Sequence, residues 1–305
     1  MKRGDYMAIG QTFISLMLLA ALTLAGCGCM RGDVRPDPSQ LEFPAYSQLA
    51  EVHNARVALL KRWHSRGVAE LRWRDERGER REPQADIDLY VDLPGRTALR
   101  VSKLGTVYLW VGSNGPRYWL FDFLGDERVA YVGRFADGSS MGSTSGVVAV
   151  GPMALLDLFA LTPLPFLPDD EQDGAVTYDT EHDAWRVEAM GAGGPIAIYF
   201  DRVSQSPVRV ECLDGAGNLA YYSMIYKDRY LSVPMPGVSA ATPPRMPGLV
   251  DVYALNEAGE VTGWLKLALD APTGHVDEGP MNRVFDLDTL MRALRPDVVR
   301  DSSAP

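Results

Sequence analysis

The sequence predicts a mainly β protein with a few helices, of the α+β class, and three observations carry this prediction. Apolar and polar residues alternate with period two in segments such as residues 85–92, which is typical of antiparallel strands with one solvated face. Turn signals such as Pro94-Gly95 and Asn114-Gly115 recur roughly every 8 to 12 residues. Beyond an apolar leader, about 260 residues remain, enough for one large domain with a sizeable core.

The first 26 residues have the pattern of a secretory leader. Two basic residues open the chain, an apolar run covers residues 7–24, and small residues precede Cys27. A membrane-spanning helix is the alternative, but Gly10 and Gln11 leave only residues 12–24 unbroken, fewer than the roughly 20 residues that a span needs. The run Leu24-Ala25-Gly26-Cys27 resembles the lipobox of bacterial lipoprotein signal peptides. That resemblance implies cleavage before Cys27 and lipidation of Cys27.

The lipobox resemblance and the patterns that follow it predict four parts of the chain. Residues 1–26 are the signal peptide, 27–44 the lipidated N-terminus and tether, 45–296 the β domain and 297–305 a polar tail. The tether is polar and broken by Pro36, Pro38 and Pro44. Two or three acyl chains hold a protein on a membrane permanently, whereas one holds it marginally. Because Gly28 stands where Asp commonly marks inner-membrane retention in Gram-negative bacteria, the resemblance favours the outer membrane, facing the periplasm.

The chain is acidic, with 30 Lys and Arg against 40 Asp and Glu and a formal net charge of −10. Nucleic acid binds clustered Lys and Arg, so this balance predicts no nucleic-acid partner. Arginines do cluster within residues 56–81, but acidic residues interleave with them, as on a solvated face. Once Cys27 is lipidated, Cys29 and Cys212 remain. A disulfide between them is one alternative, and a free, buried Cys212 is the expectation because Cys29 lies in the tether.

Helical and strand periods place the elements in order. Residues 46–63 carry one apolar stripe at helical spacing, and residues 288–294 predict a short closing helix with Asp288 as N-cap. Residues 153–161 are apolar almost all round, which predicts a buried helix. The proline-rich residues 234–248 predict a long loop or flap. Strands are predicted over residues 68–75, 84–92, 97–103, 106–111, 117–123 and 128–133, then 175–179, 184–189, 195–200, 207–213, 218–226, 249–255 and 260–268.

Two neighbouring strands are apolar on both faces. Val107, Leu109 and Val111 alternate with Tyr108 and Trp110, and the next strand repeats the pattern. Either a second layer covers the sheet, or the sheet curls around an apolar interior. We expect a cavity lined by these strands and by the apolar helix. The candidate lining residues are Val107, Leu109, Trp110, Leu120, Phe121, Leu155, Leu156 and Phe159.

The order of elements resembles the LolA/LolB superfamily of bacterial envelope lipoprotein and lipid carriers, and the related mycobacterial lipid-carrier lipoproteins. The matching stretches are residues 46–63, 67–122, the helix from 153, and the strands 196–200 and 208–214. The resemblance implies a curled antiparallel half-barrel of about 11 strands around an N-terminal and a mid-chain helix. It also implies binding of an acyl chain of a lipid or lipoprotein, without enzymatic activity.

Two departures from that family concern its lipid contacts. The receptor LolB carries a protruding loop with an apolar tip, and the turn Lys103-Leu104-Gly105-Thr106 is too short to be one. Residues 164–168 are either another apolar protrusion or a packed loop. No lipid-contacting residue is therefore carried over from the family.

Catalytic and metal motifs are weak. Residues 138–142 match G-x-S-x-G around Ser140, but no helix pattern follows, so a flexible loop is expected. Acidic residues 169–173 resemble a calcium loop without its closing Glu, and the four histidines lack zinc spacing. We expect no catalytic residue, no metal and no cofactor. A structural or interaction lipoprotein with a self-filled core is the second hypothesis, an envelope serine hydrolase the third, and the sequence sets no oligomeric state.

Overall fold

The structure is a computed structural model that describes residues 37–74, 79–125, 127–135, 150–172 and 174–301. The predicted signal peptide, Cys27, Cys29, most of the tether and the Ser140 motif lie outside the described residues. Residues 42–305 form one compact unit, and residues 1–41 form another. Of the latter, only a single 3-10 turn, Pro38–Gln40, and its neighbours are described.

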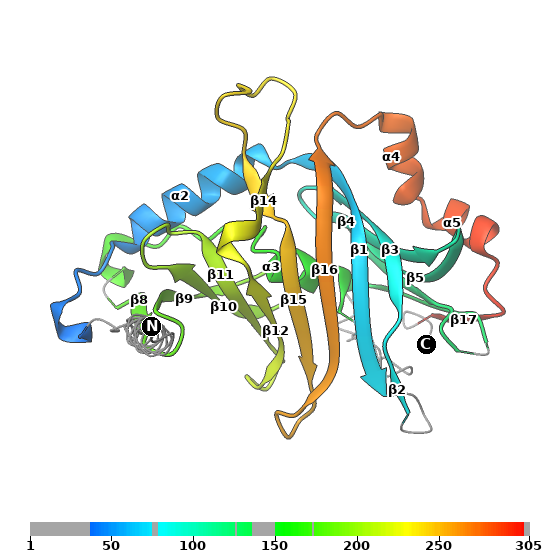
Figure 1. Cartoon of the computed structure of the whole chain (residues 1–305), viewed down its shortest axis with the longest axis horizontal. Helices are drawn as coiled ribbons and strands as arrows, with labels where there is room; N and C mark the ends of the chain where they lie inside the picture. Colours follow the sequence, from blue (N-terminus) through cyan, green and yellow to red (C-terminus); the bar gives the residue numbers. More distant parts are fainter. Residues whose placement is uncertain (1–36, 75–78, 126, 136–149, 173, 302–305) are drawn as a thin grey trace, which may run out of the picture. The chain divides into compact units, whose positions relative to one another are not determined.

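One large open sheet forms most of the unit 42–305 (Figure 1). Its strands follow the order β17-β7-β6-β5-β4-β3-β1-β16-β15-β12-β11-β10-β9-β8, with β2 paired to β1 beside this path. The bounds of the first series are β1 (Arg62–Arg74), β2 (Arg80–Arg81), β3 (Gln84–Asp92), β4 (Arg96–Lys103), β5 (Thr106–Asn114), β6 (Arg117–Asp122) and β7 (Val129–Arg134). The second series is β8 (Val176–Asp179), β9 (Ala184–Met190), β10 (Pro195–Asp201), β11 (Pro207–Leu213), β12 (Leu219–Ile225), β15 (Leu249–Leu255), β16 (Val261–Thr273) and β17 (Val298–Asp301).

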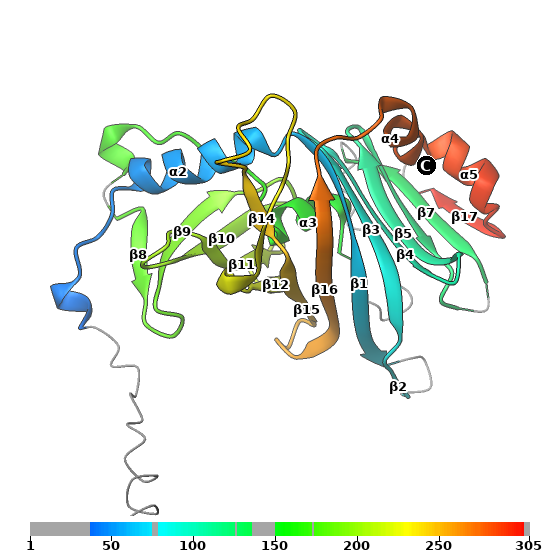
Figure 2. The same cartoon turned by 45° about the horizontal axis from the view of Figure 1, so that its top comes forward.

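The predicted fold class, mainly β with a few helices in a curled sheet, is confirmed. All ladders of the large sheet are antiparallel except the one between β17 and β7. The sheet is larger than the eleven or so strands expected. Figure 2 shows it bending into two arms that meet at β1 and β16. Within the expected polar tail, residues 297–305, the described residues Val298–Asp301 form β17 at one edge of the sheet.

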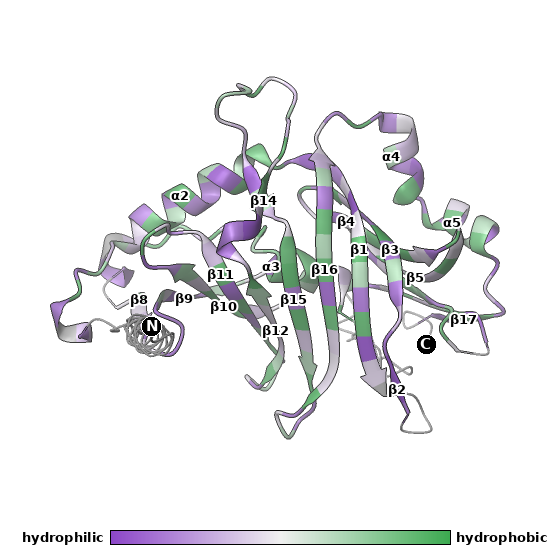
Figure 3. Ribbon diagram, in the orientation of Figure 1, coloured by the Kyte–Doolittle hydropathy of each residue, from purple (hydrophilic) through white to green (hydrophobic). Residues whose placement is uncertain are grey.

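The joint between the arms depends on one glycine. Gly67 in β1 lies opposite Leu269 of β16, next to a register shift between His64 and Arg66. A Cβ on Gly67 would lie 2.1 Å from the carbonyl oxygen of Ala268. Only glycine allows the two backbones to approach so closely. Figure 3 shows hydrophobic and hydrophilic residues alternating along both strands.

The α-helices of the described residues that pack on this sheet are α2 (Tyr46–Leu59), α3 (Pro152–Leu158), α4 (Glu278–Val284) and α5 (Leu287–Leu294). The first helix was predicted to run to residue 63, but it ends at Leu59 because Trp63 already pairs with Val91 in the sheet. The predicted N-cap of the last helix is wrong by two residues. Asp286, not Asp288, accepts the hydrogen bond from the backbone N–H of Thr289.

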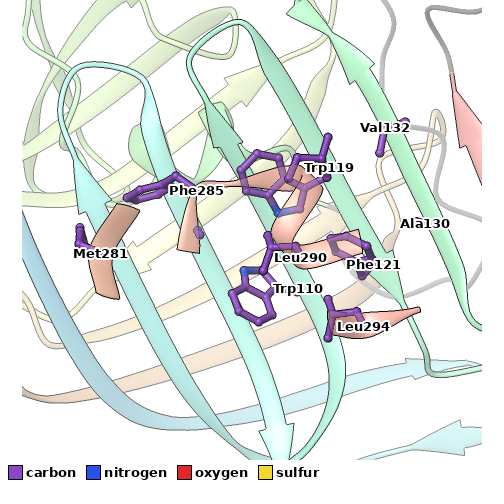
Figure 4. Packing of buried hydrophobic residues seen from close by; sticks show 11 residues of the cluster. Trp110, Trp119, Phe121, Ala130, Val132, Met281, Phe285, Leu290 and Leu294 are labelled. Atoms are coloured by element: carbon purple, nitrogen blue, oxygen red, sulfur yellow. The ribbon is translucent and has the colours of Figure 1, made fainter. Parts of the chain in front are cut away.

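Helices α4 and α5 explain why two neighbouring strands are apolar on both faces. They cover the face of β4–β7 that carries the two indoles Trp110 and Trp119 (Figure 4). The buried members of this cluster are Ala98, Trp110, Trp119, Phe121, Ala130, Val132, Met281, Phe285, Leu287, Leu290 and Leu294. We call this side the outer face. The sequence left two alternatives open, a covering layer or a curled sheet, and the structure has both.

The proline-rich segment projects from the rim of the sheet (Figure 1). Its base is a two-stranded ladder of β13 (Tyr230–Ser232) and β14 (Arg245–Pro247). The backbone N–H of Val233 donates to the carbonyl of Pro244 at 2.8 Å, and that of Gly274 donates to Pro234 at 2.8 Å. The predicted long loop thus spans the residues between two short strands, and its last part forms β14.

Candidate functional site: the covered inner face of the sheet

The inner face is the side of the sheet opposite the α4–α5 layer. Residues directly paired across strands point to the same side, so the ladders define rows of side chains. One row crosses the first arm, from β3 to β6, and another crosses the second arm, from β9 through β16 to β1. Their members are Leu89, Leu99, Val111 and Leu120, then Val187, Ile198, Val210, Ser223, Val252, Leu265 and Leu71. All are buried, and Ser223 is the single polar residue among these eleven.

Helix α3 lies across the inner face and touches both arms. It contacts β4 and β5 on one arm and β11 on the other. The hydroxyl of Ser223 donates to the carbonyl of Leu158 at 2.8 Å, and Ser113 Oγ lies 3.9 Å from Met153 Sδ. Pro152 opens the helix, where its missing N–H has no intrahelical role. The predicted mid-chain helix is thus placed between the arms (Figure 2).

Helix α2 attaches to the segment that follows α3 through side chain to backbone hydrogen bonds. Tyr46 donates to the carbonyl of Pro165 at 2.7 Å, and the amide of Asn54 bonds both backbone groups of Leu164 at 2.8 and 2.9 Å. His53 Nε2 lies 2.9 Å from the carbonyl of Thr162, and Arg56 donates to the carbonyl of Ala160. We call α2, α3 and residues 159–165 the cover. Hydrogen bonds from side chains of α2 to the backbone of residues 160–165 hold these parts together.

The protonation of His53 follows from its partners. A carbonyl can only accept, so Nε2 of His53 carries the hydrogen and Nδ1 is the acceptor. Burial, followed by the charge of Arg56, lowers the pKa of His53 to about 3. His53 is therefore neutral at every ordinary pH and contributes no charge to the cover.

Asp157 holds α3 to the turn between β9 and β10. Its carboxylate accepts hydrogen bonds from Thr162 Oγ1 at 2.5 Å, from the N–H of Ala192 at 2.9 Å and from the N–H of Gly193 at 2.7 Å. Burial raises the pKa of Asp157 in spite of these donors. A Cβ on Gly191 would lie 2.6 Å from the Asp157 carboxylate, so the glycines of this turn make room for it.

The structure divides the eight predicted lining residues between two sides of the sheet. Leu109 and Leu120 face the inner side by alternation, and Leu155, Leu156 and Phe159 are buried on and just after α3. The other three, Val107, Trp110 and Phe121, pack in the α4–α5 cluster. A register shift between Val101 and Ser102 breaks the alternation beside β5, and Val107 joins Trp110 on the outer face. The cavity itself stays a prediction.

Several residues of the cover were not singled out by the sequence. His53 is buried on α2, and two nitrogens of the half-buried Arg56 are inaccessible. The apolar Val52 and Leu59 of the same helix are exposed, so the buried side is not the apolar stripe that the sequence predicted. Asp157 is the one acidic residue of the apolar helix, and that interruption was the available signal. Trp63 Nε1 and Thr97 Oγ1 are buried without a hydrogen-bond partner, in one row of the inner face through Val91. Nothing in the sequence pattern predicts that these two polar atoms lack a hydrogen-bond partner.

The remaining sequence predictions fall elsewhere. Cys212 is free and buried, and burial raises the pKa of its thiol. Phe166 is 86% exposed while Leu164 is buried, so residues 164–168 combine a packed base with an apolar tip. Among the described residues, no group of three His, Cys, Asp or Glu could hold a metal ion. None of the described helices is long and apolar enough to span a bilayer.

Two grooves lined by described residues open on the surface, and neither is lined by a residue of the inner-face rows. One of about 500 Å³ lies between the β4–β5 turn and the end of α5, with Val107, Phe123 and Arg128 in its wall. The second, of about 280 Å³, lies beside His182 and Lys227. Of the predicted lining residues, only Val107 reaches either of these two grooves.

No family model matches the chain, and no curated protein matches its sequence. Solved structures do resemble it. A domain described as an outer membrane lipoprotein-sorting protein from Vibrio parahaemolyticus is 12% identical, with a TM-score of 0.46 over 77% of this chain and 95% of that one. A LolA superfamily protein from Nitrosomonas europaea is 8% identical, with a TM-score of 0.43 over 81% and 99%. A DUF1329 family protein from Desulfovibrio piger is 11% identical, with a TM-score of 0.43 over 80% and 96%.

At these identities and scores, the likeness concerns the fold alone.

Proposed function

We propose that this chain is a lipid-anchored protein of the bacterial envelope whose inner face receives an acyl chain of a lipid or lipoprotein. Lipidated Cys27 would hold it at the outer membrane, facing the periplasm, where it would serve lipid or lipoprotein transport without catalysing a reaction. The lipobox pattern before Cys27 supports the anchor. The inner face supports the ligand class, because hydrophobic surface is what an acyl chain binds.

One observation carries the acyl-chain proposal: a mainly apolar face extends across both arms, and the cover presents apolar side chains to it. Leu155, Leu156 and Phe159 are buried on and just after α3, which contacts strands of both arms. An acyl chain that replaced these contacts would preserve the burial of both surfaces. The hydrogen bonds of α2 run to residues 160–165 rather than to the strands, so the cover would keep most of them while it moves.

The same packing favours the alternative of a structural or interaction lipoprotein. Leu155, Leu156 and Phe159 are almost inaccessible, so this part of the interior is filled by the protein's own side chains. The two hypotheses differ in whether the cover gives way to a ligand. The third hypothesis, a serine hydrolase, depends on Ser140, which lies outside the described residues.

The test uses a chain that begins at residue 28, without the lipidated Cys27, and that retains the whole compact unit 42–305. Native mass spectrometry and lipid extraction should find a bound acyl lipid, and a fluorescent fatty acid should bind. Leu156→Asp places a carboxylate on the buried side of α3 and should abolish probe binding. Val203→Asp is the matched control, because Val203 is 80% exposed in the turn after β10.

A chain that carries no lipid and binds no probe, together with a Leu156→Asp variant that fails to fold, would favour the self-filled core. If Leu156→Asp folds and binds the probe as the wild type does, the inner face is not the acyl site.

A further inference from the structure

Arg56 is a buried cation with unused hydrogen-bond donors. Its Nη2 donates to the carbonyl of Ala160 and lies 3.4 Å from His53 Nδ1. Its Nε and Nη1 are inaccessible to solvent and have no hydrogen-bond partner. The residue as a whole is half-buried, so part of its surface remains exposed.

No carboxylate of the described residues pairs with Arg56, although the chain has 40 acidic residues. His53 is neutral, and the hydroxyl of Tyr230 donates to the carbonyl of Pro207 at 2.8 Å. Burial lowers the pKa of the guanidinium, while the nearby Tyr230 opposes that shift. The carbonyl of Ala160, just past the end of α3, supplies only partial negative charge.

Such an arrangement is unfavourable for the protein by itself. A buried charge without its counter-charge is strongly destabilising, and buried donors without acceptors are rare in native structures. The N–H groups on Nε and Nη1 match the oxygens of a carboxylate or a phosphate, which guanidinium groups bind with charge-assisted hydrogen bonds. The unmet requirement of Arg56 is therefore an anion.

The position of Arg56 relates this anion to the inner face. The Arg56 side chain extends from α2 to the carbonyl of Ala160. Tyr230, at the base of the proline-rich loop, lies near enough to raise the pKa of Arg56. The neighbouring His53 ring contacts Phe200 edge-on at 5.6 Å, near the end of β10. These contacts put the guanidinium where the cover meets the rim of the sheet. A chain lying on the inner face would have its polar end at such a rim.

We propose that Arg56 binds the anionic head group, a carboxylate or a phosphate, of the amphiphile whose acyl chain occupies the inner face. The inference rests on the proposed function and specifies its ligand: an anionic amphiphile rather than a neutral one. Arg56 would act as the selective group, and the apolar face would supply most of the contact area.

The test compares a fluorescent fatty acid with its methyl ester, which has the same chain and no charge. The chain that begins at residue 28 should bind the acid about 10-fold or more tightly than the ester. Arg56→Met should remove this preference and leave ester binding intact. Arg134→Met, an exposed arginine at the end of β7, should keep the preference.

Stability gives a second readout, with opposite signs for the two roles of Arg56. If Arg56 awaits an anion, Arg56→Met without ligand should unfold at the same or a higher temperature than the wild type. If Arg56 serves only to bond Ala160, the variant should unfold at a lower temperature. A third arm adds inorganic phosphate alone. If the site binds a free anion, phosphate should raise the unfolding temperature of the wild type as much as the amphiphile does.

Equal binding of acid and ester by the wild type would overturn the inference and leave the acyl-chain site standing. Binding of neither would overturn both. Protection by inorganic phosphate alone, without binding of the fatty acid, would assign Arg56 to a free anion and refute the amphiphile. The comparison of acid and ester on the wild type decides the question even if Arg56→Met does not fold.

Discussion

Replacing Asp157 by Ala should lower the free energy of unfolding by about 3 kcal/mol, because three hydrogen bonds of roughly 1 kcal/mol each are lost. Those bonds join α3 to Thr162, Ala192 and Gly193. Residues 192 and 193 are exposed, so water can replace the carboxylate at their N–H groups, and no larger penalty is expected. Urea unfolding followed by tryptophan fluorescence measures the change.

A double-mutant cycle with Gly191 tests the geometry of the same contact. In Gly191→Ala the new Cβ would meet the Asp157 carboxylate at 2.6 to 2.8 Å, which should cost about 1 to 3 kcal/mol. In the Asp157→Ala background that clash is absent. The double variant should therefore lose at least about 1 kcal/mol less than the sum of the single variants. Additive losses, or a loss below about 0.5 kcal/mol for Asp157→Ala, would refute the reasoning.

The pH dependence of the Asp157→Asn variant separates burial from hydrogen bonding. Burial raises the pKa of Asp157 above its ordinary value of about 3.9. The wild type therefore loses stability as the pH rises from that value through the raised pKa, whereas Asn does not titrate. The stability of the wild type minus that of Asp157→Asn should fall as the pH rises above about 4. A difference that grows with pH would show that the three donors outweigh burial.

Three further predictions address the anchor, the sheet and its ion pairs. Cys27→Ala should release the chain from membranes or leave it unprocessed, and fractionation after a high-salt wash checks this; retention there would refute the anchor. Gly67→Ala should cost about 2 to 4 kcal/mol because its Cβ would meet the Ala268 carbonyl, whereas Gly125→Ala, with open space around it, should stay within about 0.5 kcal/mol in thermal unfolding. Burial raises the pKa of Asp88, but His64 and Arg100 outweigh burial and hold the pKa below the usual range. Asp88→Asn should therefore lose about 1 to 2 kcal/mol at pH 7, and this loss should shrink as the pH falls below the ordinary carboxyl pKa of about 3.9.

The strands were predictable because two local signals agree. Period-two alternation locates a strand and glycine-containing turns end it, and both are encoded within a few residues, as in β3 and β4. The helix α4 gave no such signal. Its first turn contains Gly279 and Pro280, which favour a loop, and packing of Met281 on the sheet overrides that preference.

The candidate site was predictable in its parts and not in their grouping. The apolar residues of β5, β6 and the mid-chain helix were identified, but which of them share a space depends on the layer formed by α4 and α5, more than 150 residues away from β5 in the sequence. The isolated polar residues of the cover were equally unpredictable. Arg56 and Asp157 find their partners at Ala160 and Gly193 only after the chain has folded.

Strand β17 bears on the solubility of the protein. An open sheet has two end strands whose outer backbone groups can template the addition of another chain. β17 runs parallel along β7, and Arg300 packs over the ring of Tyr131. β8, at the other end, is only four residues long.

Without β17, the apolar strand Val129–Arg134 would become the end of the sheet. A chain truncated after residue 296 would then form aggregates as its concentration rises, while its far-UV circular dichroism would stay nearly that of the intact chain. The last few residues would thus determine whether the protein remains monodisperse.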